Sequence, residues 1–266
     1  MKRIIVGFDG SHGAATALGW AVAEARLHQA ELLPWTVLPE QTAATAGADT
    51  VPDAMRQAVK DITLGFPAEL RFGRGGPAAE LTAACTDADL LVVGSRGRTQ
   101  LAALLLGSVS RACLYQAPCT VAIVPDLPHP SRPHDRLIVA LDGSPHSRHA
   151  LRLAAEEATL RGAELHAVHA VYWDPLGVEV LAPDVGDLVA WGERLLAGDL
   201  AEAEVEARPV VVHGHPAEVL TRLGAEADLL VLGSRGHNRL AGMLLGSTSD
   251  YCAQHAPCPV MITRLP

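Results

Sequence analysis

Short apolar runs alternate along the chain with longer stretches whose apolar residues recur at helical spacing. The run at residues 3–8 has no polar alternation, which is typical of a central parallel strand buried on both faces. Ser11 can cap the helix that follows, because a serine at that place accepts a hydrogen bond from an unpaired backbone N–H. The apolar positions of that helix are Ala14, Leu18, Ala21, Val22 and Ala25. Such alternation predicts an α/β fold with a parallel, doubly wound sheet and right-handed crossovers.

The first half of the chain has the pattern of five strands and four helices. We expect the strands at residues 3–8, 31–38, 68–72, 90–93 and 120–124. We expect the helices after Ser11, around residues 53–62, from Pro77 and over residues 108–117. Proline suits the first position of a helix, because its missing N–H would have no partner there anyway. Pro216 has the same role in the second half.

The second half of the chain is a copy of the first. Residues 4–11, IIVGFDGS, match residues 137–144, LIVALDGS, at an offset of 133. Residues 88–97, ADLLVVGSRG, match residues 227–236, ADLLVLGSRG, at an offset of 139. The second copy therefore has six extra residues, the difference 139 − 133, at the counterpart of residues 33–75.

A repeat of this length is already the size of a domain, so the sequence predicts a tandem duplication and not a solenoid. We expect two five-stranded, doubly wound, Rossmann-like domains at residues 1–126 and 135–266. The linker between them, residues 127–134, is rich in proline and should be stiff.

Composition and charge exclude several classes of protein. Hydrophobic residues make up 49% of the chain and charged residues 19%, which indicates a globular and not a disordered protein. The longest aliphatic stretch, residues 101–106, is far shorter than the ~18 apolar residues of a membrane helix, so we expect no membrane partner. A net charge of −9 gives no overall electrostatic attraction to the phosphate backbone, so we expect no nucleic-acid partner. The first apolar run ends at Asp9, before a secretory signal could form, so we expect a cytoplasmic protein.

The cysteines indicate reduced thiols, because they are odd in number and no export signal accompanies them. They are Cys85, Cys113, Cys119, Cys252 and Cys258. The second and third, like the last two, are six residues apart between a helix and a strand. We expect these thiols to pack as small apolar groups, with a redox pair as the alternative.

Two loops in each copy should lie in the ligand crevice, which in an open parallel sheet is found where the strand order reverses. The first loop is Asp-Gly-Ser, at residues 9–11 and 142–144. The second has the spacing Gly-x2-Gly-x9-Gly-Ser, from Gly94 in the first copy and Gly233 in the second. Its remaining members are Gly97, Gly107 and Ser108, then Gly236, Gly246 and Ser247.

The second loop has the chemistry of a phosphate site. Gly94 and Gly97 let the backbone approach a ligand closely, and Gly107 precedes a helix whose free N–H groups and positive dipole end attract anions. Ser108 and Ser110 offer hydroxyl donors, and Arg96 and Arg98 offer positive charge. The second copy has Ser247, Ser249 and Arg235 at the positions of Ser108, Ser110 and Arg96. An ordinary strand-to-helix turn is the alternative for one copy. The occurrence of the motif twice in register favours anion binding.

Asp9 and Asp142 end the first strand of each copy, where a carboxylate can accept hydrogen bonds from an adenine amino group or a ribose hydroxyl. The alternative, which position alone leaves open, is an aspartate that forms an Asx turn or caps a helix. No second carboxylate lies at a sequence spacing that would pair it with Asp9 or Asp142, so neither aspartate is predicted to be a catalytic base.

Several catalytic and metal motifs are missing from the sequence. There is no P-loop, and lysine occurs only at Lys2 and Lys60, so kinase-type phosphoryl transfer is excluded. The glycine-rich pattern of adenylating α/β enzymes and the nucleophile elbow are also missing. We therefore predict no catalytic residue. Four histidines could suggest a metal site, but their spacing favours surface or structural roles, and we predict no metal ligand. These are His166, His169, His213 and His215.

Together, the Asp-Gly-Ser loop and the glycine-rich loop resemble those of the universal stress protein family, specifically its ATP-binding branch. The resemblance covers nearly the whole chain as a tandem pair and implies Rossmann-like, HUP-type domains. It implies adenine and ribose near Asp9 and Val37 in the first domain and near Asp142 and Ala170 in the second, with phosphates on the glycine-rich loops. The other residues implied in site one are Gly7, Val93, Gly94, Arg96, Gly97, Gly107, Ser108, Val109 and Ser110. Those implied in site two are Ala140, Leu232, Gly233, Arg235, Gly236, Gly246, Ser247, Thr248 and Ser249.

The resemblance also implies function and assembly. It suggests a stress regulator that responds to ATP, bound with Mg²⁺, and that hydrolyses ATP slowly at most. It implies edge-to-edge pairing of residues 120–124 with residues 259–263, allows a homodimer and suggests an unidentified regulatory protein partner. The alternatives are an interaction scaffold whose nucleotide sites are empty and a slow ATPase. Residues 172–187 form a longer and more acidic entrance than residues 41–49, so the two sites should differ in affinity.

Overall fold

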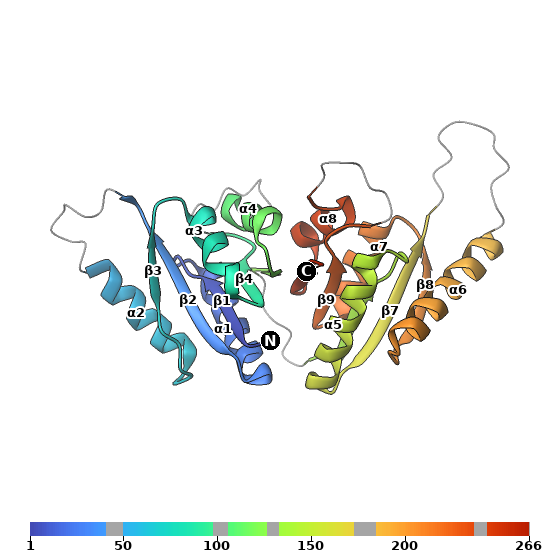
Figure 1. Ribbon diagram of the computed structural model, residues 1–266, viewed down its shortest axis with the longest axis horizontal. Coiled ribbons are helices and arrows are strands. Elements are labelled where there is room, and N and C mark those ends of the chain that lie inside the picture. The colour runs from blue at the N-terminus through green and yellow to red at the C-terminus, as the bar shows by residue number, and fades with distance from the viewer. Residues whose placement is uncertain (41–49, 98–105, 127–132, 173–184, 237–243, 266) are drawn as a thin grey trace. The chain divides into compact units, whose positions relative to one another are not determined.

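Each half of the chain folds into a five-stranded parallel sheet flanked by helices (Figure 1). The computed structural model divides the chain into two units, Met1–Pro128 and His129–Pro266. It describes every residue except 41–49, 98–105, 127–132, 173–184, 237–243 and 266. Most of the predicted linker therefore lies outside the described residues.

The first unit contains the elements that the sequence pattern predicts, in the same order. Its strands are β1 (Arg3–Gly7), β2 (Glu31–Leu38), β3 (Arg71–Arg74), β4 (Leu90–Gly94) and β5 (Thr120–Val124). Its helices are α1 (His12–His28), α2 (Thr50–Thr63), α3 (Pro77–Ala84) and α4 (Ser108–Gln116), with a short 3-10 helix, η2 (Cys85–Asp87).

The second unit repeats this order. Its strands are β6 (Arg136–Ala140), β7 (Glu164–Val171), β8 (Arg208–His213), β9 (Leu229–Gly233) and β10 (Val260–Thr263). Its helices are α5 (Pro145–Arg161), α6 (Val185–Ala203), α7 (Pro216–Leu223) and α8 (Ser247–His255), with a 3-10 helix, η3 (Gly224–Glu226).

The strand order reverses once in each sheet. It is β3-β2-β1-β4-β5 in the first unit and β8-β7-β6-β9-β10 in the second, and the pairings within each unit are parallel. The chain therefore leaves β1 toward one side of the sheet and β4 toward the other, and the loops after these strands meet at the switch point. The predicted doubly wound α/β fold is confirmed.

Buried residues and caps explain why the central elements form where they do. All five residues of β4 and all five of β9 are buried, as expected for strands covered on both faces. The Ser11 side chain accepts the Ala14 N–H at 3.2 Å and so starts α1; Ser144 accepts the Ser147 N–H at the same distance and starts α5.

The edge strand β3 is the element that the sequence pattern misplaces. The prediction was residues 68–72, whereas the strand covers Arg71–Arg74 and Ala68 makes only an isolated bridge to Leu32. Within its unit this strand has one neighbour and is only partly buried, so its apolar pattern is too weak to define its ends. In the part of the chain that the structure describes, no helix is long and apolar enough to cross a membrane.

Candidate functional site

The two predicted loops of each unit come together at the switch point. Asp9 follows β1, and Gly97 follows β4 by a few residues. A methyl group added at Gly97 would lie 3.0 Å from Asp9 Oδ2, and one added at Gly236 would overlap Asp142 Oδ2. Each aspartate carboxylate is therefore in close contact with the glycine-rich loop, although the two are far apart in the sequence.

Both aspartates form the Asx turn that the sequence left open as an alternative. Asp9 Oδ1 accepts the Ser11 N–H at 3.0 Å, and Asp142 Oδ1 accepts the Ser144 N–H at 3.0 Å. The turn holds each carboxylate at the crevice, beside the start of α1 or α5. Their contact with a nucleotide stays a prediction.

Gly94 and Gly233 are required by the packing of the chain on itself. A methyl group at Gly94 would lie 2.6 Å from the Gly13 carbonyl oxygen at the start of α1. One at Gly233 would lie 2.7 Å from the backbone of His146 in α5. The sequence pattern predicts that Gly94 makes room for a ligand, whereas the first turn of α1 occupies that space.

Gly107 and Gly246 are different, because neither backbone conformation nor packing requires glycine there. They are the N-caps of α4 and α8, with φ of −64° and −74°, and neither has a side chain to cap the helix. A methyl group at Gly107 would have no contact closer than 3.5 Å, and one at Gly246 none closer than 3.7 Å, within the described ranges. Within the described residues, each helix start therefore has room for a methyl group.

The helix starts provide backbone N–H groups. The first helical hydrogen bonds run from the Arg111 N–H to the Gly107 carbonyl and from the Asp250 N–H to the Gly246 carbonyl, each at 2.9 Å. The amides of the first three residues of each helix thus have no acceptor within their own helix. They belong to Ser108, Val109 and Ser110 in α4, and to Ser247, Thr248 and Ser249 in α8.

One predicted donor is already used. The Ser110 hydroxyl donates to the Gly94 carbonyl at 2.7 Å, and the Ser249 hydroxyl donates to the Gly233 carbonyl at 2.7 Å. These hydroxyl protons therefore join the helix to the preceding strand and are not directed to a ligand. Ser108 and Ser247 are exposed, so their hydroxyls remain accessible.

Positive charge follows each central strand. Arg96 and Arg235 are exposed, and within the described parts of the chain their guanidinium groups have no ion-pair partner. They lie two residues beyond the ends of β4 and β9, in the same loop as the glycines. Arg98 lies outside the described residues.

Strand register places the predicted base contacts beside the aspartates. Gly7 pairs with Trp35, so Asp9 is level with Val37; Ala140 pairs with Val168, so Asp142 is level with Ala170. These four predicted residues are each partly exposed at the carboxyl end of the sheet. Val93 and Leu232, at the ends of β4 and β9, are 3% exposed and form the floor behind the loops.

Sequence reasoning missed a pair of equivalent residues that support the site. The Thr36 hydroxyl donates to the Phe8 carbonyl at 2.6 Å, and His169 Nδ1 lies 2.7 Å from the Leu141 carbonyl oxygen. Both bonds fix the backbone just before the aspartate. Thr36 and His169 are 133 residues apart, which is the offset of the repeat, so comparison of the copies could have found them.

The histidines considered for a metal have separate partners. His169 binds the Leu141 carbonyl, and His166 Nε2 lies 3.0 Å from Glu164. The hydrogen bond from His166 is the main cause that lowers the pKa of Glu164 below its ordinary value. The His215 ring packs against Tyr172.

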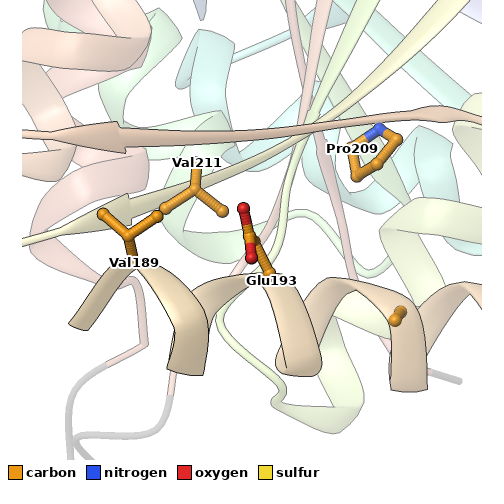
Figure 2. A pocket seen from close by; sticks show the side chains of 5 residues that line it. Val189, Glu193, Pro209 and Val211 are labelled. Atoms are coloured by element: carbon orange, nitrogen blue, oxygen red, sulfur yellow. The ribbon is translucent and has the colours of Figure 1, made fainter. Parts of the chain in front are cut away.

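A hollow in the second unit lies away from these loops. Figure 2 shows it between α6 and the strand β8. Its lining residues are Val189, Glu193, Ala197, Pro209 and Val211. None of them is a predicted site residue, so this hollow is not the candidate site.

Comparison with known proteins identifies the family. The sequence model of the Universal stress protein family matches residues 1–125 and again residues 133–264. The chain belongs to the universal stress protein family. It is a tandem universal stress protein, since two complete matches lie in one chain, and the resemblance of the two loops is confirmed at the level of the family.

Relatives with the same tandem length support this assignment. The chain is similar to the universal stress protein Rv2005c of Mycobacterium tuberculosis, at 32% identity over 98% of this chain and 96% of that protein. It is also similar to the universal stress protein MT2698 of the same species, at 34% identity over 98% and 96%. A universal stress protein from Archaeoglobus fulgidus has the same fold, with a TM-score of 0.69, 24% identity and 98% of each chain covered.

Proposed function

We propose that each domain of this tandem universal stress protein binds ATP, and that the protein regulates a stress response according to nucleotide. The observation that carries the proposal is the open N-cap glycine of α4 and of α8. In the described part of the chain, neither backbone conformation nor packing requires glycine at Gly107 or Gly246, and a ligand that approaches the helix start closely would require it.

The chemistry around these glycines fits a nucleotide with several phosphates. Three backbone amides at each helix start can bind phosphate oxygens, and the helix dipole favours negative charge there. Arg96 and Arg235 add an exposed cation to each site. At the other end of the crevice, Asp9 and Asp142 can accept hydrogen bonds from a ribose or an adenine amino group.

The residues of the crevice also indicate how Mg²⁺ would be bound. At residues 107–110 and 246–249 the loops offer amides and hydroxyls but no carboxylate. Mg²⁺ would therefore be held mainly by the phosphate oxygens of ATP and by water, which is how this ion commonly binds. When bound, it would neutralise phosphate charge.

The proposal includes the assembly that the family resemblance implies. Residues 120–124 would pair with residues 259–263, two chains would form a homodimer, and a regulatory protein in the cytoplasm would read the nucleotide state. We propose a binding protein and not an efficient enzyme, because the sequence places no base or lysine to activate water or phosphate.

Calorimetric titration with ATP and Mg²⁺ tests the proposal. We expect two ATP per chain, one after Gly107→Glu or Gly246→Glu, and none after both changes, because a carboxylate would fill the space and repel phosphate. Gly19→Glu and Gly198→Glu are matched controls, because each glycine is exposed on a helix and a methyl group there would meet no described atom outside that helix within 4 Å. Both changes should leave the two sites intact. Absence of binding at millimolar ATP would contradict the proposal, as would full binding by the double variant.

A further inference from the structure

An exposed aromatic side chain lies at the carboxyl end of β7 in the second domain, two residues beyond Ala170. Tyr172 follows the last residue of β7 and is 48% exposed. Its ring contacts the ring of His215 edge to face, with centroids 5.3 Å apart and an interplanar angle of 71°. His215 is the N-cap of α7, so its backbone is fixed by the helix and the tyrosine is held against a rigid element.

The pleat of β7 places Tyr172 on the crevice side of the sheet. Side chains two residues apart share one face of a strand, which groups Val168, Ala170 and Tyr172. Val168 pairs with Ala140 on β6, two residues before Asp142. His169, on the other face, packs its ring against Trp191 of α6. Tyr172 therefore extends the wall formed by Ala170, where the base is predicted to lie.

The first domain has no counterpart of this aromatic pair. At an offset of 133, Tyr172 corresponds to Pro39, and at an offset of 139, His215 corresponds to Gly76. The helix starts differ as well, since Arg111 of α4 corresponds to Asp250 of α8 at an offset of 139. The Arg111 guanidinium lies over the ring of Tyr115, 5.8 Å from its centroid, and Asp250 Oδ2 accepts a hydrogen bond from Gln254 Nε2 at 2.8 Å, so both charged groups contact their own helix.

We propose that Tyr172, positioned by His215, stacks on the purine base and makes the second domain the base-selective site of the pair. The inference rests on the proposed function. An aromatic side chain that stacks on a base strengthens binding of that base, and Tyr172 is 48% exposed, which leaves a face of its ring accessible to a second ring. The first domain has Pro39 at the position of Tyr172 and therefore relies more on its phosphate contacts.

Single-site variants make the inference testable. Gly107→Glu leaves only the second site, and Gly246→Glu leaves only the first. For each we would measure the Kd of Mg·ATP, AMP and inorganic tripolyphosphate by calorimetry. The second site should prefer ATP over tripolyphosphate by a larger factor than the first. Tyr172→Ala, made in the Gly107→Glu chain, should weaken both ATP and AMP about 5- to 30-fold and leave tripolyphosphate unchanged.

Matched variants separate stacking from other effects. Tyr172→Phe should bind like the parent, because stacking needs the ring and not the hydroxyl. His215→Ala should weaken ATP binding less than Tyr172→Ala does, since it only loosens the tyrosine ring.

Two further variants serve as controls at other positions. Pro39→Ala in the Gly246→Glu chain tests the equivalent position of the first domain. Tyr251→Ala removes another exposed tyrosine that stacks on a histidine, His255, at 3.9 Å. Pro39→Ala and Tyr251→Ala should each change the Kd of ATP by less than about two-fold.

Two outcomes would overturn the inference, and they differ. If the single-site chains bind ATP but Tyr172→Ala binds ATP and AMP as tightly as its parent, the stacking role is wrong and the proposed function stands. If neither single-site chain binds ATP, the proposed function fails and the inference fails with it.

Discussion

Glycines that look alike in the repeated loop have two different physical roles. Gly94 lies against the first turn of α1 and Gly233 against the first turn of α5, where a methyl group would come within 2.6–2.7 Å of backbone atoms. Gly107 and Gly246 have room for a methyl group. Substitution by alanine therefore separates a contact within the protein from a contact with a ligand.

We predict that Gly94→Ala destabilises the first domain by about 1–3 kcal/mol, because two backbone segments must move apart. Gly107→Ala combined with Gly246→Ala should lower the free energy of unfolding by only about 0.5–1 kcal/mol in each domain, because alanine is a poorer N-cap than glycine but meets no close contact there. It should nevertheless weaken ATP by about ten-fold, since the methyl groups displace the phosphates from the amides. Urea denaturation and calorimetry measure the two effects. ATP binding at the original affinity in the double alanine variant would show that the space has no ligand role.

The reactivity of the five cysteine thiols depends on the surroundings of each residue. Burial raises the pKa of Cys113, Cys252 and Cys258 to about 12. A hydrogen bond with Cys119, together with burial, raises the pKa of Cys85 far above its ordinary value. Cys119 is the one cysteine of the five, all of them described, that is not buried.

We predict that one thiol of the native protein reacts quickly with an aromatic disulfide reagent at pH 8, and that all five react in guanidinium. The buried thiols should stay slow at pH 9, because their pKa lies well above that pH. Cys119→Ser should remove the fast phase. A fast phase of two or more thiols would instead favour the redox-pair alternative.

At the scale of elements, an aspartate joins the two central strands of each sheet at their amino ends. Asp89 Oδ2 accepts the N–H groups of Lys2 and Arg3 at 2.6 and 2.9 Å. Asp228 accepts the His134 N–H at 2.9 Å in the second domain. Desolvation tends to raise the pKa of Asp89, but the two N–H donors outweigh it and lower the pKa.

The pH dependence follows from the sign of this shift. A folded-state pKa below the unfolded value of about 3.9 means that the stabilisation is complete above that pH and is lost as the pH falls through the folded pKa. We predict that Asp89→Asn lowers the free energy of unfolding by about 1 kcal/mol at pH 7. The difference from the parent should shrink below about pH 4. Urea denaturation at both pH values measures it, with the exposed neighbour Asp87→Asn as control. A difference that is independent of pH would contradict the role of the charge.

Elements with strong local signals could be predicted from the sequence, and those without could not. β2 and β5 have the predicted bounds, and α3 and α7 begin at their prolines. These elements are specified by neighbouring residues, through apolar runs and caps. The edge strand β3 was shifted because half-buried strands have a weak apolar pattern.

At the scale of the whole molecule, duplication supplied two copies of one fold that have since diverged. The helix α2 has 14 residues and its counterpart α6 has 19, so much of the six-residue difference lies there. The central strands and both loops have kept their spacing. Each unit has its own sheet and core, which should allow each to fold alone.

We predict that a chain ending at Pro128 folds cooperatively and binds one ATP. The family resemblance pairs the last strands of the two domains, so amides of β5 should exchange hydrogen faster in the isolated domain than in the full chain. Amides of the central strand β1 are the internal control and should exchange alike in both. Hydrogen exchange followed by mass spectrometry measures this. Equal protection of β5 in both chains would contradict pairing through that strand.

The sequence by itself determined the repeat, the α/β class, most strand and helix positions and the family, because periodicity, caps and motif spacing depend on residues close together in the chain. Only the tertiary structure decided which glycines pack against the protein and which face open space. It also brought Asp9 against Gly97 and Tyr172 against His215. Those contacts join residues far apart in sequence, and they depend on strand order and register, which no local pattern specifies.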